Sequence, residues 1–291
     1  MISIVIASHK KTEDLDRCLE SVFSQRPRDT EVIVVGNAFS FGDSDLFRKQ
    51  YPGAILIINT DNKGSACARN QGIRLAKGEY IMFLDSDAYL CNNFFDNLEN
   101  VLKKAPSHVG AIAPKILNAD SRKVFSCGLR ISPLYRVHDV GANEDGDALS
   151  RTLQIDGPNS CCAIFKRACL ESIKDGEEYF DEDFFFLFED ADLARRLKEE
   201  GCDSLFVPEL ICYHYGGGSN MPQDFRRYLC FRNRLYMIMK IKDRQKRLSV
   251  FAKSFLYDFL RTLHFFLTNK YFTVAVRDIC KKAKHEKNTD F

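Results

Sequence analysis

The sequence lacks several features that would assign it to a specialised class of protein. No stretch approaches the roughly 18 consecutive apolar residues of a membrane-spanning helix, which excludes a polytopic membrane protein. Charge of one sign is not in excess either, with 42 lysines and arginines against 40 aspartates and glutamates. The 291 residues are 45% hydrophobic and 28% charged, which excludes collagen, coiled coil and wholesale disorder. This length predicts one large domain or two fused halves.

Paired cysteine spacings are also missing. The 11 cysteines are scattered, no C-x-x-C pair occurs, and only Cys161 and Cys162 are adjacent. A zinc site or a disulfide framework would need paired spacings. We therefore predict free, mostly buried thiols in a reducing cytoplasm. The apolar start, residues 1–7, lacks the basic lead of a signal peptide and is expected to be a buried strand.

Strands and helices alternate in the first half of the chain. Apolar, β-branched runs predict strands, and apolar residues at helical spacing between them predict helices. This alternation predicts parallel βαβ units in a doubly wound α/β sheet, whose ligands bind beyond the carboxyl ends of the strands. The second half is less regular, with a helix near 190–200 and a loop-like stretch at 118–150. The predicted strands of the first half cover residues 3–7, 31–35, 54–58 and 80–84.

Two carboxylates leave the fourth predicted strand in the segment Asp85-Ser86-Asp87. Residues i and i+2 of a strand point to the same side, so both carboxylates can converge on one cation. Oxygen ligands suit Mg²⁺ or Mn²⁺, which commonly bridge phosphates. The alternative is a solvated turn, since D-x-D is a common pattern.

A second acidic group, Glu189-Asp190-Ala191-Asp192, opens the helix near 190–200. Acidic residues there can simply cap the first turn, and Asp192 fits that interpretation. Glu189 and Asp190 follow the apolar run 184–188, which can desolvate a carboxylate and raise its pKa, as a general base requires.

Two further segments combine glycine with basic residues or histidine. Lys63 and Arg69 flank the start of a predicted helix, which is either an anion site or an ordinary surface helix. His214 precedes a run of glycines at 216–218. Such a histidine is usually structural, but a neutral imidazole can also complete a metal shell.

The order of these segments resembles glycosyltransferase family 2, with its GT-A fold, and most closely its bacterial rhamnosyltransferase-like branch. The resemblance runs from Ser3 to about Asn233. The matching segments are Ser3-Ile4-Val5-Ile6, Asn62-Lys63-Gly64 through Ala68-Arg69-Asn70-Gln71-Gly72, Gly78-Glu79-Tyr80 with Leu84-Asp85-Ser86-Asp87-Ala88, Asp156-Gly157-Pro158, Phe180-Asp181-Glu182, Phe184-Phe185 with Glu189-Asp190-Ala191-Asp192-Leu193, Pro208-Glu209 to His214, and Gly218-Ser219. Each motif alone is weak, but their ordered combination is specific.

The resemblance implies an inverting transfer of a sugar from a nucleoside-diphosphate sugar, dTDP-rhamnose or a UDP-sugar, to a hydroxyl of a growing cell-surface glycan. By this analogy Mn²⁺ or Mg²⁺ is held by Asp85, Asp87 and His214. Asp190 is the general base, and Glu189 helps to place a glycan or lipid-linked glycan acceptor. The donor is expected to contact Ser8, Asn37, Lys63, Arg69, Asp85 and Ser86.

The family often has an acidic residue after the second strand, where this chain has Gly36-Asn37. Two rival functions remain open. A nucleotidyltransferase would show a glycine-rich loop after the first strand, and residues 7–11 contain no glycine. A non-catalytic nucleotide-sugar-binding or scaffold subunit could keep the fold, although the intact acidic residues argue against it.

The chain from residue 223 onward is strongly basic, with 17 lysines and arginines against six aspartates and glutamates. Aromatic and apolar residues recur there at helical spacing, which predicts contact with an anionic membrane surface through residues 225–285. The alternative is a helix that docks on the rest of the protein. No recognition motif supports a nucleic-acid partner.

The sequence as a whole predicts the following organisation. We expect a GT-A domain at 1–222, with a nucleotide-sugar half (1–110) and an acceptor half (111–222). A helical segment follows at 223–291, and the protein is expected to be cytoplasmic and peripheral at the inner face of the membrane.

Overall fold

The computed structural model describes residues 1–9, 12–216 and 221–289. Its contacts divide the chain into two units. Unit 1 comprises Met1–Arg130, His138–Phe185 and Glu189–Ser219, and unit 2 comprises Ile131–Val137, Phe186–Phe188 and Asn220–Phe291. The domain boundary expected after residue 222 stays a prediction. Unit 2 also takes two short segments from inside the expected first domain.

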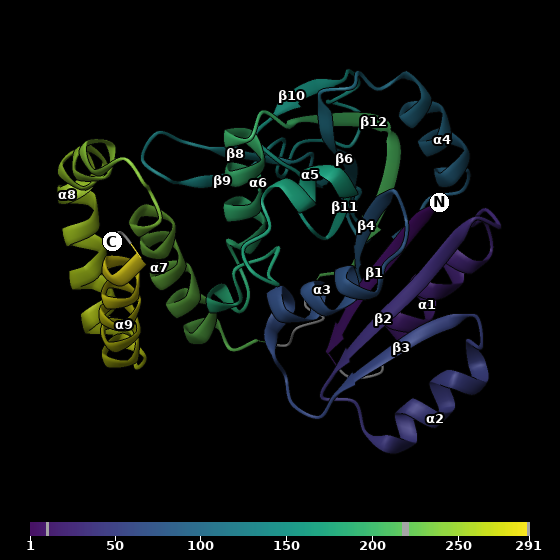
Figure 1. The fold of residues 1–291 in the computed structure, drawn as a ribbon, viewed down its shortest axis with the longest axis horizontal. Coiled ribbons are helices and arrows are strands. Elements are labelled where there is room, and N and C mark those ends of the chain that lie inside the picture. The colour runs from purple at the N-terminus through teal and green to yellow at the C-terminus, as the bar shows by residue number, and fades with distance from the viewer. Residues whose placement is uncertain (10–11, 217–220, 290–291) are drawn as a thin grey trace. The chain divides into compact units, whose positions relative to one another are not determined.

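A mostly parallel sheet forms the centre of unit 1 (Figure 1). Its parallel half has the order β4-β1-β2-β3, and the antiparallel strand β11 then joins β4 to β6, with β12 beyond. Because β11 is antiparallel to both neighbours and β12 is parallel to β6, the carboxyl ends of β4, β6 and β12 lie at one edge. These strands are β1 (Ile2–His9), β2 (Thr30–Asn37), β3 (Ala54–Asn59), β4 (Tyr80–Asp85), β6 (Val109–Asn118), β11 (Cys162–Lys166) and β12 (Asp203–His214).

Helices cover both faces of this sheet, as the sequence predicted. Neighbouring residues of β1 point to opposite sides: Ile4 joins one apolar cluster and Val5 the other. The first cluster includes side chains of α1 (Glu13–Phe23), α2 (Phe41–Gln50) and α4 (Phe94–Lys104). The second includes side chains of α3 (Gly64–Leu75), α5 (Arg167–Ser172) and α6 (Glu189–Glu199). The doubly wound α/β architecture is confirmed.

Two stretches differ from their sequence-based expectation. Residues 118–150, expected to be loop-like, include β7 (Val124–Ser126), β8 (Leu129–Ile131) and β9 (Val137–Asp139). The strand expected only at 205–207 continues through Pro208 to His214, with a register shift against β6 between Val207 and Ile211. Proline lacks the N–H that a ladder needs, so pairing stops there and resumes beyond it. The remaining strands are β5 (Ala88–Leu90) and β10 (Leu153–Ile155), and η1 (Glu182–Phe184) is a 3-10 turn.

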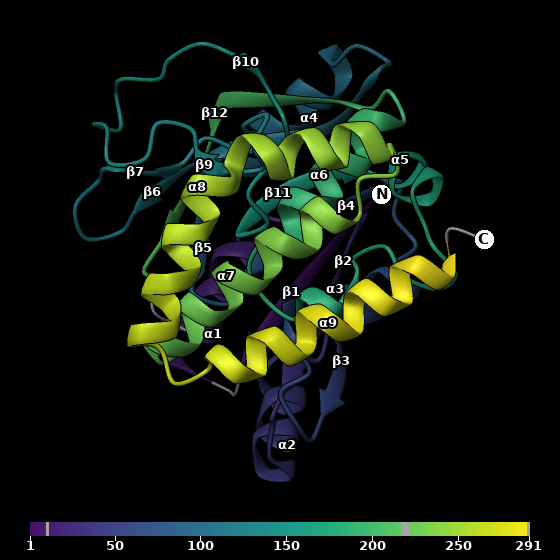
Figure 2. The same cartoon turned by 90° about the vertical axis from the view of Figure 1, so that its left-hand side faces the viewer.

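The main part of unit 2 consists of three helices, α7 (Gln223–Met239), α8 (Arg244–Thr268) and α9 (Phe272–Thr289). Helix α7 packs against both α8 and α9 (Figure 2). Aromatic pairs join them, including stacked Phe231 and Phe265, whose ring centroids are 4.6 Å apart. Within the described residues, none of the helices combines the length and apolarity needed to cross a bilayer.

Candidate active site

The candidate site lies in unit 1, at the carboxyl edge of the sheet. Asp85 is the last residue of β4, and His214 is the last residue of β12. His214 pairs with Ala88 of β5, directly after the Asp85-Ser86-Asp87 turn. The long β12 therefore brings a residue from far along the chain beside the two aspartates that leave β4.

His214 and Asp87 are adjacent at this edge. Nε2 of His214 is 3.3 Å from Oδ1 of Asp87. Burial alone would lower the pKa of His214, but its hydrogen bond with Asp87 and the charges of Asp87 and Asp85 raise that pKa overall. Nδ1 of His214 is buried and has no hydrogen-bond partner among the described residues. An imidazole with an unpartnered nitrogen beside carboxylates is a suitable donor set for a divalent cation.

A cysteine that the sequence did not single out also belongs to this group. Asp85, Cys161 and His214 each offer one ligand atom, and these atoms lie within 4.8 Å of one another. The backbone N–H of Asp85 donates to the carbonyl of Cys161 at 2.8 Å, because β11 runs antiparallel beside β4. Only this long-range pairing brings Cys161 to the site, so no local pattern could have revealed it. The 11 cysteines are free thiols, as expected, but only five of them are buried, five are half-buried and Cys280 is exposed.

Arg69 occupies the centre of the site and is only 3% exposed. Its Nη2 donates to Oδ1 of Asp85 at 2.9 Å, and its Nη1 donates to Oε1 of Glu189 at 2.7 Å. The hydroxyl of Ser65 donates to the same Glu189 oxygen at 2.7 Å. The second carboxylate oxygen of Glu189 is buried, and no residue in the described part of the chain hydrogen-bonds to it. Arg69 thus connects the aspartate of β4 to the start of α6.

Asp190, next to Glu189, has a different environment. Burial and the neighbouring charge of Glu189 raise its pKa to about 7, against a smaller lowering by Arg69. The backbone N–H of Ser160 lies 3.5 Å from its Oδ2. A carboxylate with a pKa near neutrality is suited to accept a proton from a hydroxyl group.

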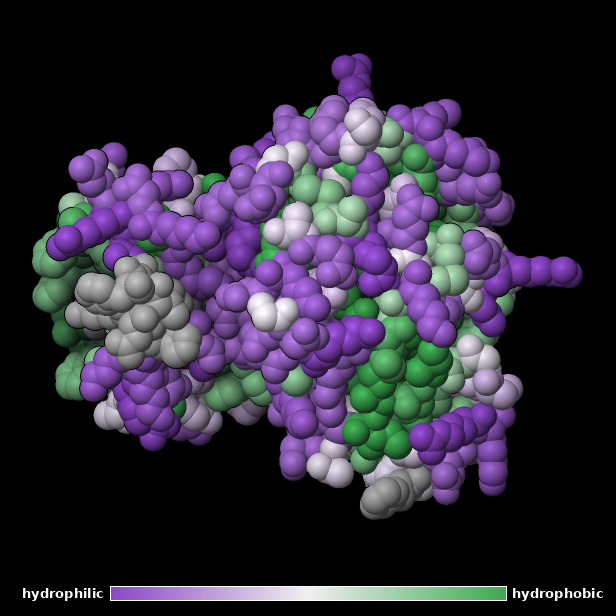
Figure 3. Space-filling model, viewed as in Figure 1, coloured by the Kyte–Doolittle hydropathy of each residue, from purple (hydrophilic) through white to green (hydrophobic). Residues whose placement is uncertain are grey.

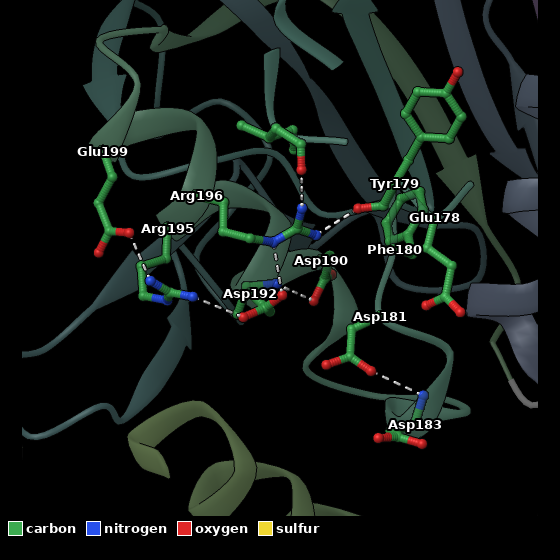
Figure 4. A network of polar contacts seen from close by, with 12 residues as sticks. Glu178, Tyr179, Phe180, Asp181, Asp183, Asp190, Asp192, Arg195, Arg196 and Glu199 are labelled. Atoms are coloured by element: carbon green, nitrogen blue, oxygen red, sulfur yellow. Dashed lines mark hydrogen bonds and ion pairs between the residues drawn. The ribbon is translucent and has the colours of Figure 1, made fainter. Parts of the chain in front are cut away.

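Asp192, in the same turn, has a structural role, as Figure 4 shows. Its buried carboxylate accepts hydrogen bonds from Nη2 of Arg195 at 3.1 Å and from Nε of Arg196 at 2.9 Å. Arg196 also donates to the carbonyl of Ile173 at 2.9 Å. These contacts fix α6 and therefore the position of the two residues that begin it.

The remaining residues expected to contact the donor are spread along the same edge. Lys63 is exposed just before α3, Ser86 is half-buried, and Ser8 is buried in β1. Asn37 is buried, with its Nδ2 donating to the carbonyl of Gly64 and its Oδ1 accepting from Asn59. These contacts hold α3 against β2, and recognition of the base by Asn37 stays a prediction. Gly218 and Ser219 lie outside the described residues.

The sequence model of glycosyl transferase family 2 matches residues 3–173 of this chain. A segment is 36% identical over 90 residues to the UDP-Glc:alpha-D-GlcNAc-diphosphoundecaprenol beta-1,3-glucosyltransferase WfaP of Escherichia coli. Another is 37% identical over 95 residues to the poly(ribitol-phosphate) beta-glucosyltransferase of Bacillus spizizenii. Each alignment covers 31% of this chain, and they span 36% and 15% of the respective relatives.

Solved structures share the fold at low sequence identity. GalNAc-T7 with UDP, GalNAc and Mn²⁺ superposes with a TM-score of 0.64 at 17% identity, covering 84% of this chain and 49% of that protein. The mannosyltransferase PcManGT of Pyrobaculum calidifontis, in complex with GDP-Man and Mn²⁺, gives a TM-score of 0.57 at 17% identity. This superposition covers 99% of this chain and 86% of that protein. Because the family model spans more than half of the residues, this chain belongs to glycosyltransferase family 2 and is a glycosyltransferase with a GT-A type fold.

Proposed function

We propose that this enzyme transfers a sugar, with inversion, from a nucleoside-diphosphate sugar to a hydroxyl group of a growing cell-surface glycan. The donor is dTDP-rhamnose or a UDP-sugar. The observation that carries the proposal is geometric: Arg69 pairs with both Asp85 and Glu189, so Asp190 at the start of α6 lies near the edge that holds Asp85, Asp87 and His214. A proton acceptor and a set of cation ligands thereby share one end of the sheet. The rhamnosyltransferase branch remains a prediction.

Asp190 is the general base in this proposal. It accepts the proton of the acceptor hydroxyl as that oxygen attacks the anomeric carbon, and the bond from that carbon to the diphosphate breaks. Glu189 is held by Arg69 and Ser65 through one carboxylate oxygen. Its other oxygen has no partner within residues 1–9, 12–216 and 221–289, and it can accept a hydrogen bond from an acceptor hydroxyl, which would orient the acceptor.

The residues at the edge fit a divalent cation. Asp85, Asp87 and His214 offer two carboxylates and an imidazole, and Nε2 of that imidazole lies 3.3 Å from Oδ1 of Asp87. We assign these three residues as the ligands of Mn²⁺ or Mg²⁺, with the thiol of Cys161 within reach of the same place. Such an ion would supply positive charge to the departing diphosphate. Lys63 and Ser86 are proposed to contact the donor.

A lipid-linked glycan at the inner face of the membrane is the proposed acceptor. Support comes from the Escherichia coli relative, whose name specifies a diphosphoundecaprenol-linked sugar as its acceptor. An acceptor of that kind would place this enzyme in the cytoplasm, at the inner face of the membrane.

The test combines a donor panel with one variant. Hydrolysis and binding are measured for dTDP-rhamnose, UDP-glucose, UDP-galactose, UDP-N-acetylglucosamine and GDP-mannose, in Mn²⁺, Mg²⁺ or EDTA. We expect one donor to react in a metal-dependent way. Asp190→Asn should abolish transfer to the acceptor but retain donor binding, whereas Asp183→Asn, in an exposed position nearby, should leave both intact. Donor binding by the wild type without any turnover would support the scaffold alternative.

A further inference from the structure

Several polar residues of helix α8 face inward. Ser254 is fully buried, and its hydroxyl donates to Asp258, which also pairs with Arg234 of α7. Arg261 lies over the ring of Phe231 at 5.6 Å. The spacing of the packed residues, from Val250 through Ser254 and Asp258 to Phe265, follows one face of a helix. This inward face is mixed in polarity, although inward faces of surface helices are normally apolar.

The opposite face of α8 is apolar and exposed. Its side chains recur every three or four residues over more than five turns. They form the α8 stripe, which includes no charged residue, and Figure 3 shows hydrophobic atoms over α8 at the left margin. The members, with their exposed fractions, are Leu248 (58%), Phe251 (38%), Phe255 (68%), Leu256 (68%), Phe259 (55%), Leu260 (55%), Leu263 (44%), Phe266 (59%) and Leu267 (71%).

The charges beside the α8 stripe are positive. The only acidic residue of α8, Asp258, is turned inward toward Arg234. Arg244, Lys246 and Lys253 of the same helix are exposed. A strongly apolar face flanked by exposed cations is the arrangement of helices that lie in the interface of an anionic bilayer.

We propose that the α8 stripe binds the surface of an anionic membrane, with α8 lying in the plane of the interface. A second copy of this chain is a poorer occupant, because it would bring two strongly basic segments together. Anionic lipid instead complements the flanking lysines and arginine and buries the exposed phenylalanines and leucines. The proposal stands on α8 alone and does not depend on the identity of the sugar donor.

The first test uses the absence of tryptophan from the chain. The variant Leu260→Trp carries a single fluorophore in the α8 stripe, and Leu46→Trp, at a position 54% exposed on α2, is its control. Vesicles of phosphatidylcholine with phosphatidylglycerol should shift the Leu260→Trp emission to the blue, and brominated lipids should quench it. The Leu46→Trp emission should not change, and added salt should weaken the response.

The second test measures flotation of the full chain with the same vesicles. Leu256→Gln with Leu260→Gln should weaken the partition coefficient by roughly tenfold for each leucine. The matched control, Leu46→Gln with Leu75→Gln, removes two exposed leucines elsewhere and should float like the wild type. All variants should hydrolyse the donor at the wild-type rate, so a failed donor assay would bear on the proposed function and not on membrane binding.

Two outcomes would overturn the proposal. One is an unchanged Leu260→Trp spectrum, with no flotation of the wild type on anionic vesicles. The other is a wild-type dimer in sedimentation analysis that Leu256→Gln with Leu260→Gln converts to a monomer, which would identify a second copy as the occupant.

Discussion

Two adjacent carboxylates at the start of α6 have different surroundings. Glu189 is paired with Arg69 at 2.7 Å, whereas Asp190 is only partly balanced by that arginine and has its pKa raised to about 7. Two neighbouring carboxyl groups whose environments differ in this way can take different roles in one reaction. One is suited to orient a hydroxyl and the other to accept its proton.

The pKa of Asp190 predicts a pH dependence of transfer. Asp190 must be ionised to accept a proton, so kcat/KM should be constant well above pH 7 and fall about tenfold per pH unit well below it. The measurement is kcat/KM between pH 5 and 9 with the donor that the panel identifies. Asp183→Asn should keep the same profile, and a profile that stays flat down to pH 5 would exclude Asp190 as the base.

The two buried ion pairs of Arg69 predict that its substitution lowers the stability of the protein. Arg69→Ala would leave Asp85 and Glu189 without the cation between them, and breaking a buried pair typically costs about 3–5 kcal/mol. The control Lys103→Ala removes an exposed pair with Glu99, which solvent screens, so it should leave the stability nearly unchanged. Urea unfolding of the wild type and the two variants measures both changes in the free energy of unfolding. Equal stability of the two variants would contradict a central role for Arg69.

At the scale of elements, the start of α3 is hydrogen-bonded both to the end of β2 and to the segment that precedes α6. The backbone N–H of Ser65 donates to the carbonyl of Phe185 at 2.8 Å, and Asn37 donates to the carbonyl of Gly64 at 3.1 Å. Gly64 has a φ of 84°, and a Cβ there would lie 2.3 Å from the carbonyl oxygen of Phe185. Close approach of the two backbones therefore requires glycine.

Gly64→Ala should destabilise the protein by more than about 1–2 kcal/mol, because left-handed backbone and a steric clash coincide. It should also lower kcat, since the displaced Phe185 segment leads directly to Glu189. Gly42→Ala on α2 is the matched control: its Cβ would meet only Ser40, at 3.9 Å. We expect that control to be neutral or stabilising by up to about 1 kcal/mol. Thermal unfolding measures the change in stability of both variants, and kinetics with the donor measure the change in kcat.

At the scale of the whole molecule, unit 2 takes two segments from within the catalytic part of the chain. Asn233 of α7 is fully buried and donates to the carbonyls of Phe186 and Leu187, at 2.9 and 2.6 Å. Leu187 has a φ of 66°, a left-handed backbone that persists only when its surroundings hold it. The helices of unit 2 thus stabilise the segment that precedes Glu189.

A chain that ends at Pro222 tests this dependence. It keeps the residues assigned to the donor and the metal, so we expect it to bind the nucleotide of the active donor. Without Asn233, the segment Phe186–Phe188 loses its hydrogen bonds and should be cleaved by protease faster than in the full chain. Calorimetry with the nucleotide and mass spectrometry of the fragments measure the two effects. Equal protection of that segment in both proteins would contradict the role of Asn233.

Local patterns in the sequence predicted the alternation of strands and helices and the polar residues at the end of β4. These features depend on neighbours a few residues apart, through helical and strand periodicity. The acidic start of α6 was visible for the same reason. The ordered set of motifs then indicated the family.

Tertiary structure alone decided which of these residues meet and which surfaces stay exposed. Cys161 faces Asp85 because β11 inserts antiparallel between β4 and β6, and Arg69 lies between two carboxylates that are 104 positions apart. The amphipathic period of α8 was evident in the sequence, but not that its apolar face points outward. Periodicity defines the faces of a helix, whereas long-range contacts, such as the pairing of Asp258 with Arg234 and the stacking of Phe265 on Phe231, determine which face is packed.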